Sequence, residues 1–203
     1  MKDNARGIRI NIMAKINNCQ EKTDAELVTL ALQESAYFGC LMKRYEGKLL
    51  AYIRRLSGFD QEEAADILQN VFIKIYYNLN DFDNDLKFSS WIYRITHNET
   101  VDELRKKSVR PQIILSDDEW SRVSGQIDLE KEINQNFDRD EVNAILVGLD
   151  KKYRDVLILK FLEDYDYRDI SDILQKPMGT IGTLINRAKR KFKEQYISYH
   201  KKI

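Results

Sequence analysis

Residues 166–193 constrain the fold most, because they hold two short helical patterns separated by an abrupt break. The first pattern is amphipathic, with Ile170 and Ile173 on one side, and it ends just before Pro177, which cannot continue a helix and disfavours helical geometry in the preceding residue. The second opens at Gly179 and repeats apolar residues at helical spacing, which predicts one buried stripe. Two helices joined by so tight a turn are typical of a helix-turn-helix, a shape that fits the major groove of DNA.

The face opposite this buried stripe carries small, polar and basic side chains. A surface that contacts phosphates and base edges requires side chains of these kinds. A basic helix that is merely solvated is the alternative, but the short turn and the small Ser171 where the helices cross favour DNA binding. Gly182 and Leu184 offer little to base edges, so we expect strong salt dependence and modest selectivity. The predicted DNA-binding residues are Thr180, Gly182, Thr183, Asn186, Arg187, Lys189, Arg190 and Lys193.

Helical periodicity also dominates the rest of the chain, which contains only eight glycines and two prolines. Thr23 and Glu26 form a capping box at the start of one helix. Residues 64–79 carry the cleanest amphipathic pattern. We therefore predict an all-α protein of two small helical domains joined by a linker. The predicted segments are an N-terminal extension 1–23, a first domain 24–110, an acidic linker 111–136 and a helix-turn-helix domain 137–203.

Charge is segregated along the chain, although its total is neutral, with 33 basic and 33 acidic side chains. Residues 184–203 hold seven basic side chains and one acidic, a net charge of +6. Residues 111–141 hold three basic and nine acidic side chains, a net charge of −6. Segregated charge of this kind favours a protein that docks onto several partners.

The sequence lacks the signatures of an enzyme: it has no glycine-rich phosphate loop, metal-ligand spacing or nucleophile motif, and only two histidines. We therefore expect no catalytic residue, metal or cofactor. Cys19 and Cys40 are not spaced as metal ligands, and we expect free thiols in a reducing cytoplasm. Arg6, Arg9 and Lys15 interrupt the N-terminus, and no apolar stretch approaches a membrane span, so we expect a cytoplasmic protein without membrane insertion.

Two further patterns lie in order along the chain, one in each predicted domain. The first domain contains AYFGCLMKRYEGKLLAYIRRL, DILQNVFIKIYYNLNDF and FSSWIYRITHNETVDELRKK. The second contains YRDVLILKFLEDYDYRDISDIL, followed by the helix that opens with glycine and threonine. Together they resemble bacterial sigma factors of the sigma-70 family, specifically the small extracytoplasmic-function (ECF) group. The resemblance implies a protein that binds core RNA polymerase, reads the minus-ten and minus-thirty-five elements of promoter DNA with its first and second domains, and has an anti-sigma factor as a further partner.

The resemblance assigns the polymerase contact to the outer face of the 64–79 helix, which meets a basic coiled coil on the largest polymerase subunit. Carboxylate and amide groups on one helical face offer acceptors to arginine side chains, so the chemistry suits that partner. Asn70 stands where the family usually has an acidic residue, which removes one charge from the contact. The predicted polymerase-binding residues are Asp66, Gln69, Asn70 and Lys74.

The resemblance also assigns the minus-ten strand to residues 80–105, where aromatic rings, amides and cations occur together, as a reader of unstacked bases requires. Asn98 corresponds to the family's asparagine beside the pocket for a flipped base. Trp91 can pack in the core instead of stacking on a base. We expect His97 to be a phosphate contact or a surface group. In the second domain, Arg187 matches the family's most persistent basic position. The predicted minus-ten residues are Phe88, Ser89, Ser90, Trp91, Arg94, His97, Asn98 and Arg105.

The alternative function is a two-domain transcriptional regulator that binds duplex DNA on its own through the helix-turn-helix, with the first domain as a sensor. Such a regulator leaves the pattern across residues 64–105 without a role. It also predicts DNA binding in the absence of polymerase, so a gel-shift assay with and without core polymerase distinguishes the two functions.

Overall fold

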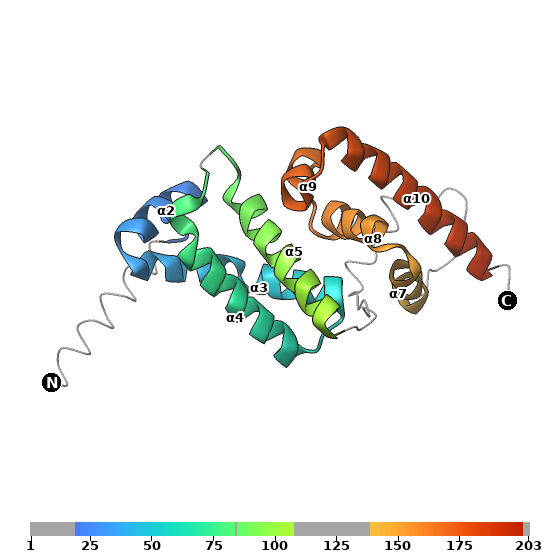
Figure 1. Ribbon diagram of the computed structural model, residues 1–203, viewed down its shortest axis with the longest axis horizontal. Coiled ribbons are helices and arrows are strands. Elements are labelled where there is room, and N and C mark those ends of the chain that lie inside the picture. The colour runs from blue at the N-terminus through green and yellow to red at the C-terminus, as the bar shows by residue number, and fades with distance from the viewer. Residues whose placement is uncertain (1–18, 84, 108–138, 201–203) are drawn as a thin grey trace.

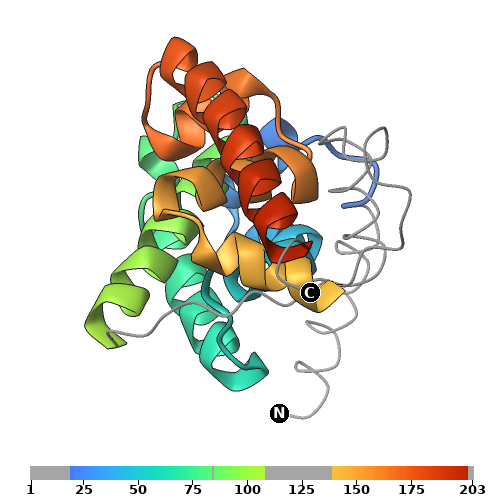
Figure 2. The ribbon, with the colours of Figure 1, turned by 90° about the vertical axis from the view of Figure 1, so that its right-hand side faces the viewer.

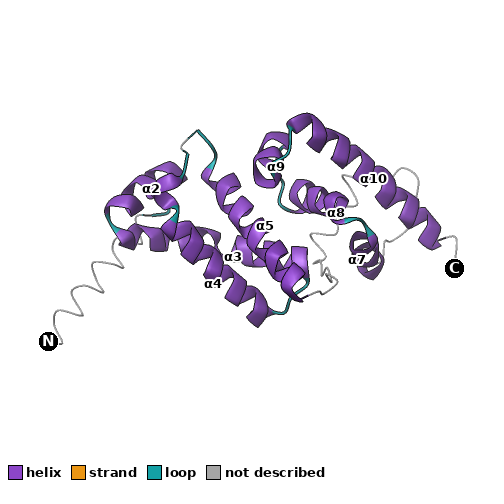
Figure 3. Cartoon of the chain, in the orientation of Figure 1, coloured by secondary structure: helices purple, strands orange, loops and turns teal. Residues whose placement is uncertain are grey.

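The computed structural model describes residues 19–83, 85–107 and 139–200, and all regular structure in these ranges is helical (Figure 3), which confirms the predicted all-α fold. The N-terminal helices are α2 (Asp24–Gln33), the short η1 (Ser35–Tyr37), α3 (Phe38–Ser57), α4 (Gln61–Tyr77), η2 (Leu79–Asp81) and α5 (Phe88–Lys107). The C-terminal helices are α7 (Arg139–Gly148), α8 (Lys151–Leu157) with its π-helical continuation η3 (Ile158–Leu162), α9 (Tyr167–Leu174) and α10 (Met178–His200). The predicted linker 111–136 and residues 1–18 of the predicted extension lie outside the described residues.

Local sequence signals set the ends of several helices. The predicted capping box of α2 is present: the backbone N–H of Thr23 donates to Glu26 Oε2 at 2.7 Å, and the N–H of Glu26 donates back to Thr23 Oγ1. Asp60 and Glu63 cap α4 in the same way. Gly58 ends α3 in the left-handed conformation, with φ at 72°, a geometry that favours glycine.

The N-terminal helices share one apolar core, in which α3, α4 and α5 pack against one another and α2 packs against α3. Leu49 and Ile53 of α3, Val71 and Ile75 of α4, and Ile92 of α5 are each at most 1 % exposed. Full burial of such a side chain contributes about 1.5–3 kcal/mol. The apolar stripe predicted for residues 64–79 therefore faces the core, which leaves the opposite face of α4 in solvent.

The two cysteines, which we predicted to be free thiols, form a disulfide between Cys19 and Cys40. Their Cα atoms are 5.9 Å apart across a sequence separation of 21 residues. Arg44 of α3 supports the same junction by donating to the carbonyl oxygens of Cys19 and Lys22, each at 2.7 Å. The prediction was wrong because the pairing depends on the segment before α2 folding back against α3, which no local spacing reveals.

The predicted helix-turn-helix is formed by α9 and α10. Gln175 ends α9 in the left-handed conformation, with φ at 52°, and α10 begins directly after Pro177. The hydroxyl of Ser171 donates to the carbonyl oxygen of Lys176 at 2.5 Å and so closes the turn. The predicted apolar stripe of α10 is buried, at Ile181, Ile185, Ala188 and Phe192.

The two halves of the chain lie against each other along α5 (Figure 1). This helix packs against α3 and α4 within its own domain and against α9 of the other. After a 90° turn, α10 lies nearest the viewer and the N-terminal helices lie behind it, so α10 is on the far side of the C-terminal domain from α5 (Figure 2). Among the described helices, none combines the length and the apolar character that crossing a membrane requires.

Candidate nucleic-acid and protein interfaces

The outer face of α10 presents an exposed stripe of polar and basic side chains. Thr183 Oγ1 donates to the carbonyl oxygen of Gly179 at 2.9 Å, and Arg190 Nε lies 3.7 Å from Glu194 Oε1. Exposed ion pairs of this kind are weak, so Arg190 can turn toward a phosphate at little cost. The predicted residues on this stripe are Thr180, Thr183, Asn186, Arg187 and Arg190.

Three other predicted residues of α10 are half-buried. Gly182 faces the ring of Tyr167 in α9, where a methyl group would lie 3.6 Å from the ring. The ammonium group of Lys189 lies 5.1 Å from the centre of the Phe161 ring, in cation–π range. Lys193 is half-buried as well. These three residues are therefore less accessible to DNA than the exposed stripe.

The outer face of α4 presents the predicted acceptors for a basic protein partner. Asp66, Gln69 and Asn70 are exposed on this face. Ile73 and Tyr77, which are 47 % and 76 % exposed, extend the same face by one and two turns. Acceptor groups beside exposed apolar side chains suit a protein partner that brings arginine side chains.

Lys74, the fourth residue predicted for this surface, is held by α5 instead. Its ammonium group forms an ion pair with Glu99, whose side chain is only 9 % exposed. A buried carboxylate without a cation would be costly, so Lys74 has a structural task in pairing it. The side chain is still 54 % exposed, and the assignment of Lys74 to the polymerase contact stays a prediction.

The residues predicted to bind the minus-ten strand divide into buried and accessible groups. Phe88 and Trp91 pack with Phe82 in an aromatic cluster whose ring centres lie 5.2 to 5.7 Å apart, so they support α5 and do not stand free to stack on a base. Ser90 is 1 % exposed. In this arrangement a strand cannot reach these three residues, and their assignment to the minus-ten strand stays a prediction. The accessible or half-buried members are Ser89, Arg94, Asn98 and Arg105.

Arg94 and Asn98 line a groove of about 410 Å³ between α4 and α5. The edge of Trp91 and the Lys74–Glu99 ion pair also border it. An amide can both donate to and accept from a base edge, and an arginine beside it adds positive charge. The groove, which Asp81 and Asp102 also line, therefore offers hydrogen-bonding groups that suit the edge of an unstacked base.

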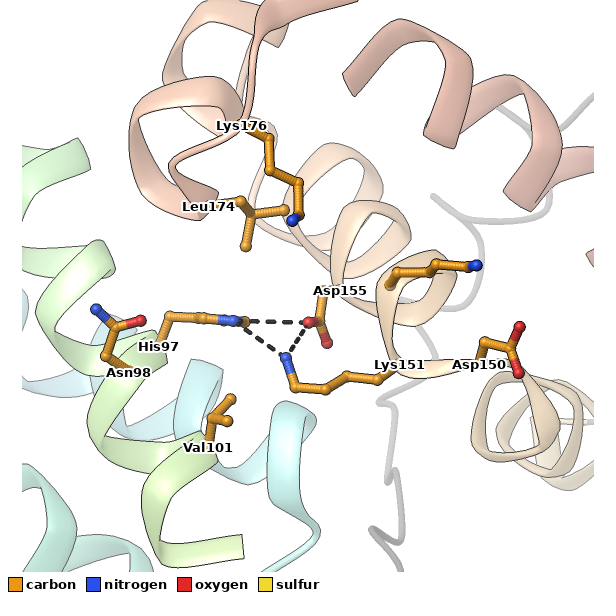
Figure 4. Close-up of a pocket in the computed structure, with 9 residues that line it drawn as sticks. His97, Asn98, Val101, Asp150, Lys151, Asp155, Leu174 and Lys176 are labelled. Atoms are coloured by element: carbon orange, nitrogen blue, oxygen red, sulfur yellow. Dashed lines mark hydrogen bonds and ion pairs between the residues drawn. The ribbon is translucent and has the colours of Figure 1, made fainter. Parts of the chain in front are cut away.

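His97, predicted to be a phosphate contact or a surface group, is instead buried between the two domains (Figure 4). Its Nδ1 lies 2.9 Å from the Tyr52 hydroxyl, and its Nε2 lies 3.4 Å from Lys151 Nζ and 3.6 Å from Asp155 Oδ2. Burial lowers the pKa of His97 to about 4. The nearby carboxylate of Asp155 opposes this shift, whereas the positive charges of Lys151 and Lys176 lower the pKa further. The prediction was wrong because α8 covers a helix face that local sequence would leave in solvent.

A second interdomain contact centres on Asp169 of α9, whose side chain is 7 % exposed. It accepts hydrogen bonds from Lys87 Nζ at 2.8 Å and from Ser90 Oγ at 3.2 Å. Asp166, the N-cap of α9, lies 3.6 Å from the same ammonium group. The hydrogen bond to Asp169 raises the pKa of Lys87, so the lysine remains charged in this contact.

A third interdomain contact centres on Glu163, at the end of η3. It forms an ion pair with Arg55 of α3 and accepts a hydrogen bond from the Tyr93 hydroxyl at 2.8 Å. The rings of Tyr93 and Tyr165 pack edge-on with their centres 4.9 Å apart. Sequence reasoning missed these contacts, although the residues lie within the quoted patterns, because each pair joins positions far apart in the chain.

An exposed basic stripe on a helix-turn-helix, a polar groove beside α5 and a separate acceptor face on α4 are typical of a two-domain helical DNA-binding protein that also has a protein partner. Residues 41–110 match the family model of Sigma-70 region 2, and residues 139–192 match that of Sigma-70, region 4. The chain is 30 % identical over 167 residues to the ECF RNA polymerase sigma factor SigW of Bacillus subtilis (strain 168). The matched residues make up 78 % of this chain and 88 % of SigW. It is 31 % identical over 159 residues to the RNA polymerase sigma-H factor of Pseudomonas aeruginosa, over 75 % of this chain and 82 % of that protein. The chain belongs to the ECF group of the sigma-70 family, as the sequence patterns predicted.

Two solved structures share the fold. CnrH in complex with the cytosolic domain of CnrY matches 86 % of this chain and 97 % of its own, with a TM-score of 0.62 and 23 % identity. The sigma factor RpoE in complex with the anti-sigma factor NepR, from Bartonella quintana, matches 78 % of this chain and 95 % of its own, with a TM-score of 0.56 and 18 % identity. Both support the two-domain helical architecture described above.

Proposed function

We propose that this chain binds core RNA polymerase, directs it to promoter DNA and starts transcription, in the cytoplasm and without a catalytic activity of its own. Membership of the ECF group carries the proposal, since sigma factors are transcription initiation factors that leave the chemistry to the polymerase. The same membership favours this function over an autonomous regulator that binds duplex DNA without polymerase.

Within this function, we assign the polymerase contact to the outer face of α4. Asp66, Gln69 and Asn70 supply acceptors for basic groups of the polymerase, and Ile73 and Tyr77 add apolar area beside them. The region 2 match spans this helix, which supports the assignment.

Promoter recognition is divided between the two domains. The N-terminal domain, residues 24–110, offers the groove of Arg94 and Asn98 to the minus-ten strand. The C-terminal domain, residues 137–203, offers the exposed stripe of α10 to the duplex at the minus-thirty-five element. Arg187 and Arg190 are the strongest candidates there, because both are fully charged and exposed.

We also propose an anti-sigma factor as a regulatory partner. The RpoE structure from Bartonella quintana holds the anti-sigma factor NepR, and the CnrH structure holds the cytosolic domain of CnrY. Since this chain shares the fold of both proteins, its helical domains offer a comparable surface to such a partner.

The test of the function is a double substitution on α4, Asp66→Lys with Gln69→Lys. Two added ammonium groups would repel a basic partner, so we expect the variant to lose co-purification with core polymerase and promoter-dependent transcription, with helical content unchanged. A matched control, Gln20→Lys with Glu46→Lys, makes the same change in charge at exposed positions away from α4 and should retain both activities. Undiminished pull-down by the α4 variant would refute the assignment of this face.

A further inference from the structure

The disulfide between Cys19 and Cys40 is unusual for a protein that works beside RNA polymerase. Glutathione and thioredoxin keep thiols reduced in the cytoplasm, and the disulfides that do form there are usually transient or redox-sensing. Both cysteines are buried, and their Cα atoms lie 5.9 Å apart, a separation that a disulfide spans without movement of the backbone. The fold therefore brings the two sulfurs together, and the redox state of the surroundings decides whether the bond persists.

The bond ties a non-helical stretch of chain to a helix. Cys40 is part of α3, whereas Cys19 lies in the stretch that leads into α2. Arg44 of α3 holds the same stretch, since it donates to the carbonyl oxygens of Cys19 and Lys22, each at 2.7 Å. It also pairs with Asp24 at 2.6 Å, in a contact whose two side chains are 26 % and 28 % exposed. Water competes for such polar contacts, so they can open once the disulfide is reduced.

The chain beside both cysteines is open to solvent. Gln20 and Gly39, which are their neighbours in the sequence, are exposed. A side chain added at Gly39 would meet no atom within 4 Å. A small displacement of the stretch before α2 would therefore bring the two sulfurs within reach of a small thiol or a dithiol protein.

Helix α2 connects this bond to the groove that we propose for the minus-ten strand. The apolar face of α2 is buried, and the helix packs against both α3 and η2. Asp81 of η2 lines the groove. Phe82, directly after η2, packs on Trp91, which also lines the groove, with their ring centres 5.2 Å apart. A loosened α2 would therefore loosen this wall of the groove.

We infer that Cys19 and Cys40 are a redox-responsive pair, whose disulfide braces α2, and through it η2, under oxidising conditions. A peroxide can form the bond: one thiol reduces it to water and becomes a sulfenic acid, and the second thiol then displaces a second water from that sulfur. A dithiol protein reverses the reaction through a mixed disulfide and is itself oxidised to a disulfide. The inference rests on the cytoplasmic function and the groove proposed above.

The first experiment tests the redox response in the whole chain. The protein is equilibrated in oxidised or in reduced glutathione, and its free thiols are counted on a denaturing gel after alkylation with a maleimide-linked polyethylene glycol. We expect no free thiol in the first buffer and both thiols in the second. A bond that persists in reduced glutathione, or thiols that stay free in oxidised glutathione, would overturn the inference.

Thermal unfolding followed by circular dichroism tests the effect on stability. Reduction should lower the midpoint by about 5–10 °C, because the cross-link no longer restricts the unfolded chain. The variant Cys19→Ala, Cys40→Ala has no cross-link, so its midpoint should be the same in both buffers. An equal change in the variant would assign the effect to the buffer and not to the bond.

Amide hydrogen exchange tests whether the bond braces η2. Reduction of the wild type should speed exchange about tenfold in α2 and η2, because both depend on the tied stretch, and should leave α9 and α10 unchanged. Unchanged exchange in η2 would overturn the brace.

Promoter binding tests the link to the groove. Oxidised wild type and the Cys19→Ala, Cys40→Ala variant are compared as holoenzymes without thiol reagents, so that the cysteines of the polymerase are not affected. A forked promoter should bind the variant about fivefold more weakly, as when the population with a competent groove falls to about a fifth. Equal affinity would overturn the link. Failure of both proteins to bind core polymerase would instead refute the proposed function and leave the redox result standing.

Arg44 provides a test within the same junction. Arg44→Gln removes hydrogen bonds that hold the stretch before α2 once the disulfide is open, so it should lower the midpoint more in the reduced protein than in the oxidised protein. Arg54→Gln, at an exposed arginine of the same helix, is the control and should have the same effect in both states. Equal losses for Arg44→Gln in both states would show that the disulfide and Arg44 do not hold the same stretch.

Discussion

His97 is a titratable side chain whose surroundings come from both domains. Tyr52 approaches it from α3, Asp155 and Lys151 approach from α8, and Lys176 acts from the turn before α10. In this arrangement, burial lowers its pKa to about 4, whereas an exposed histidine has a pKa of about 6.5. Between about pH 6.5 and pH 4, the form in which the two domains contact each other therefore binds fewer protons at His97 than a form in which the domains are separated.

Domain closure should consequently depend on pH. Its His97 contribution is fully present above about pH 6.5 and is lost progressively as pH falls toward 4, because the open form takes up the proton. Scattering measured from pH 7.5 to pH 5 should show the radius of gyration rising. The variant His97→Gln, which cannot titrate, should respond less over this range. An identical response by the variant would assign the effect to other groups.

Asn98 tests whether the groove between α4 and α5 reads a base. Asn98→Ala should cost roughly 1–3 kcal/mol of discrimination at one minus-ten position, because the amide can both donate to and accept from a base edge. Holoenzyme binding to a library of forked promoters varied across the element measures this loss. Gln20→Ala, which removes an exposed amide outside the groove and outside residues 80–105, is the control. Equal losses on every sequence would give Asn98 a structural role.

At the scale of the helices, the sequence predicted what depends on local periodicity and failed where distant segments meet. The turn at Pro177 and the buried stripe of α10 follow from spacing within a few residues. Ser90 and Asp169 are 79 residues apart in the chain, so no local pattern joins them. Arg55 and Glu163 are separated by 108 residues. The helix-turn-helix and the face of α4 were therefore predictable, whereas the buried side of α5 was not.

The recognition helix α10 offers exposed cations but few groups for base edges, and this balance makes a prediction for duplex binding. Arg190→Ala should lower the magnitude of the log–log salt slope by about 1 and weaken all sequences alike, because a phosphate contact carries no sequence information. Arg187→Ala should relax preference at a single base pair, if its guanidinium reaches a guanine. Both variants are measured on a promoter library across salt concentrations. The reverse pattern would mean that α10 lies rotated in the groove.

In the whole molecule, the three proposed binding surfaces differ in accessibility. The outer faces of α4 and α10 are exposed, whereas α5 is partly covered by the C-terminal domain (Figure 1). Contact between the two domains therefore leaves α4 accessible to the polymerase.

We predict that weakening the contacts between the domains does not alter the α4 contact. The variant Glu163→Gln, Asp169→Asn removes two carboxylates from those contacts. Wild type and this variant should bind a fragment of the largest polymerase subunit that carries its basic coiled coil with dissociation constants within about twofold, since distant sites act independently. Isothermal titration calorimetry measures both. The Asp66→Lys, Gln69→Lys variant should lose binding in either background. Tenfold tighter binding by the Glu163→Gln, Asp169→Asn variant would show that contact between the domains hinders α4.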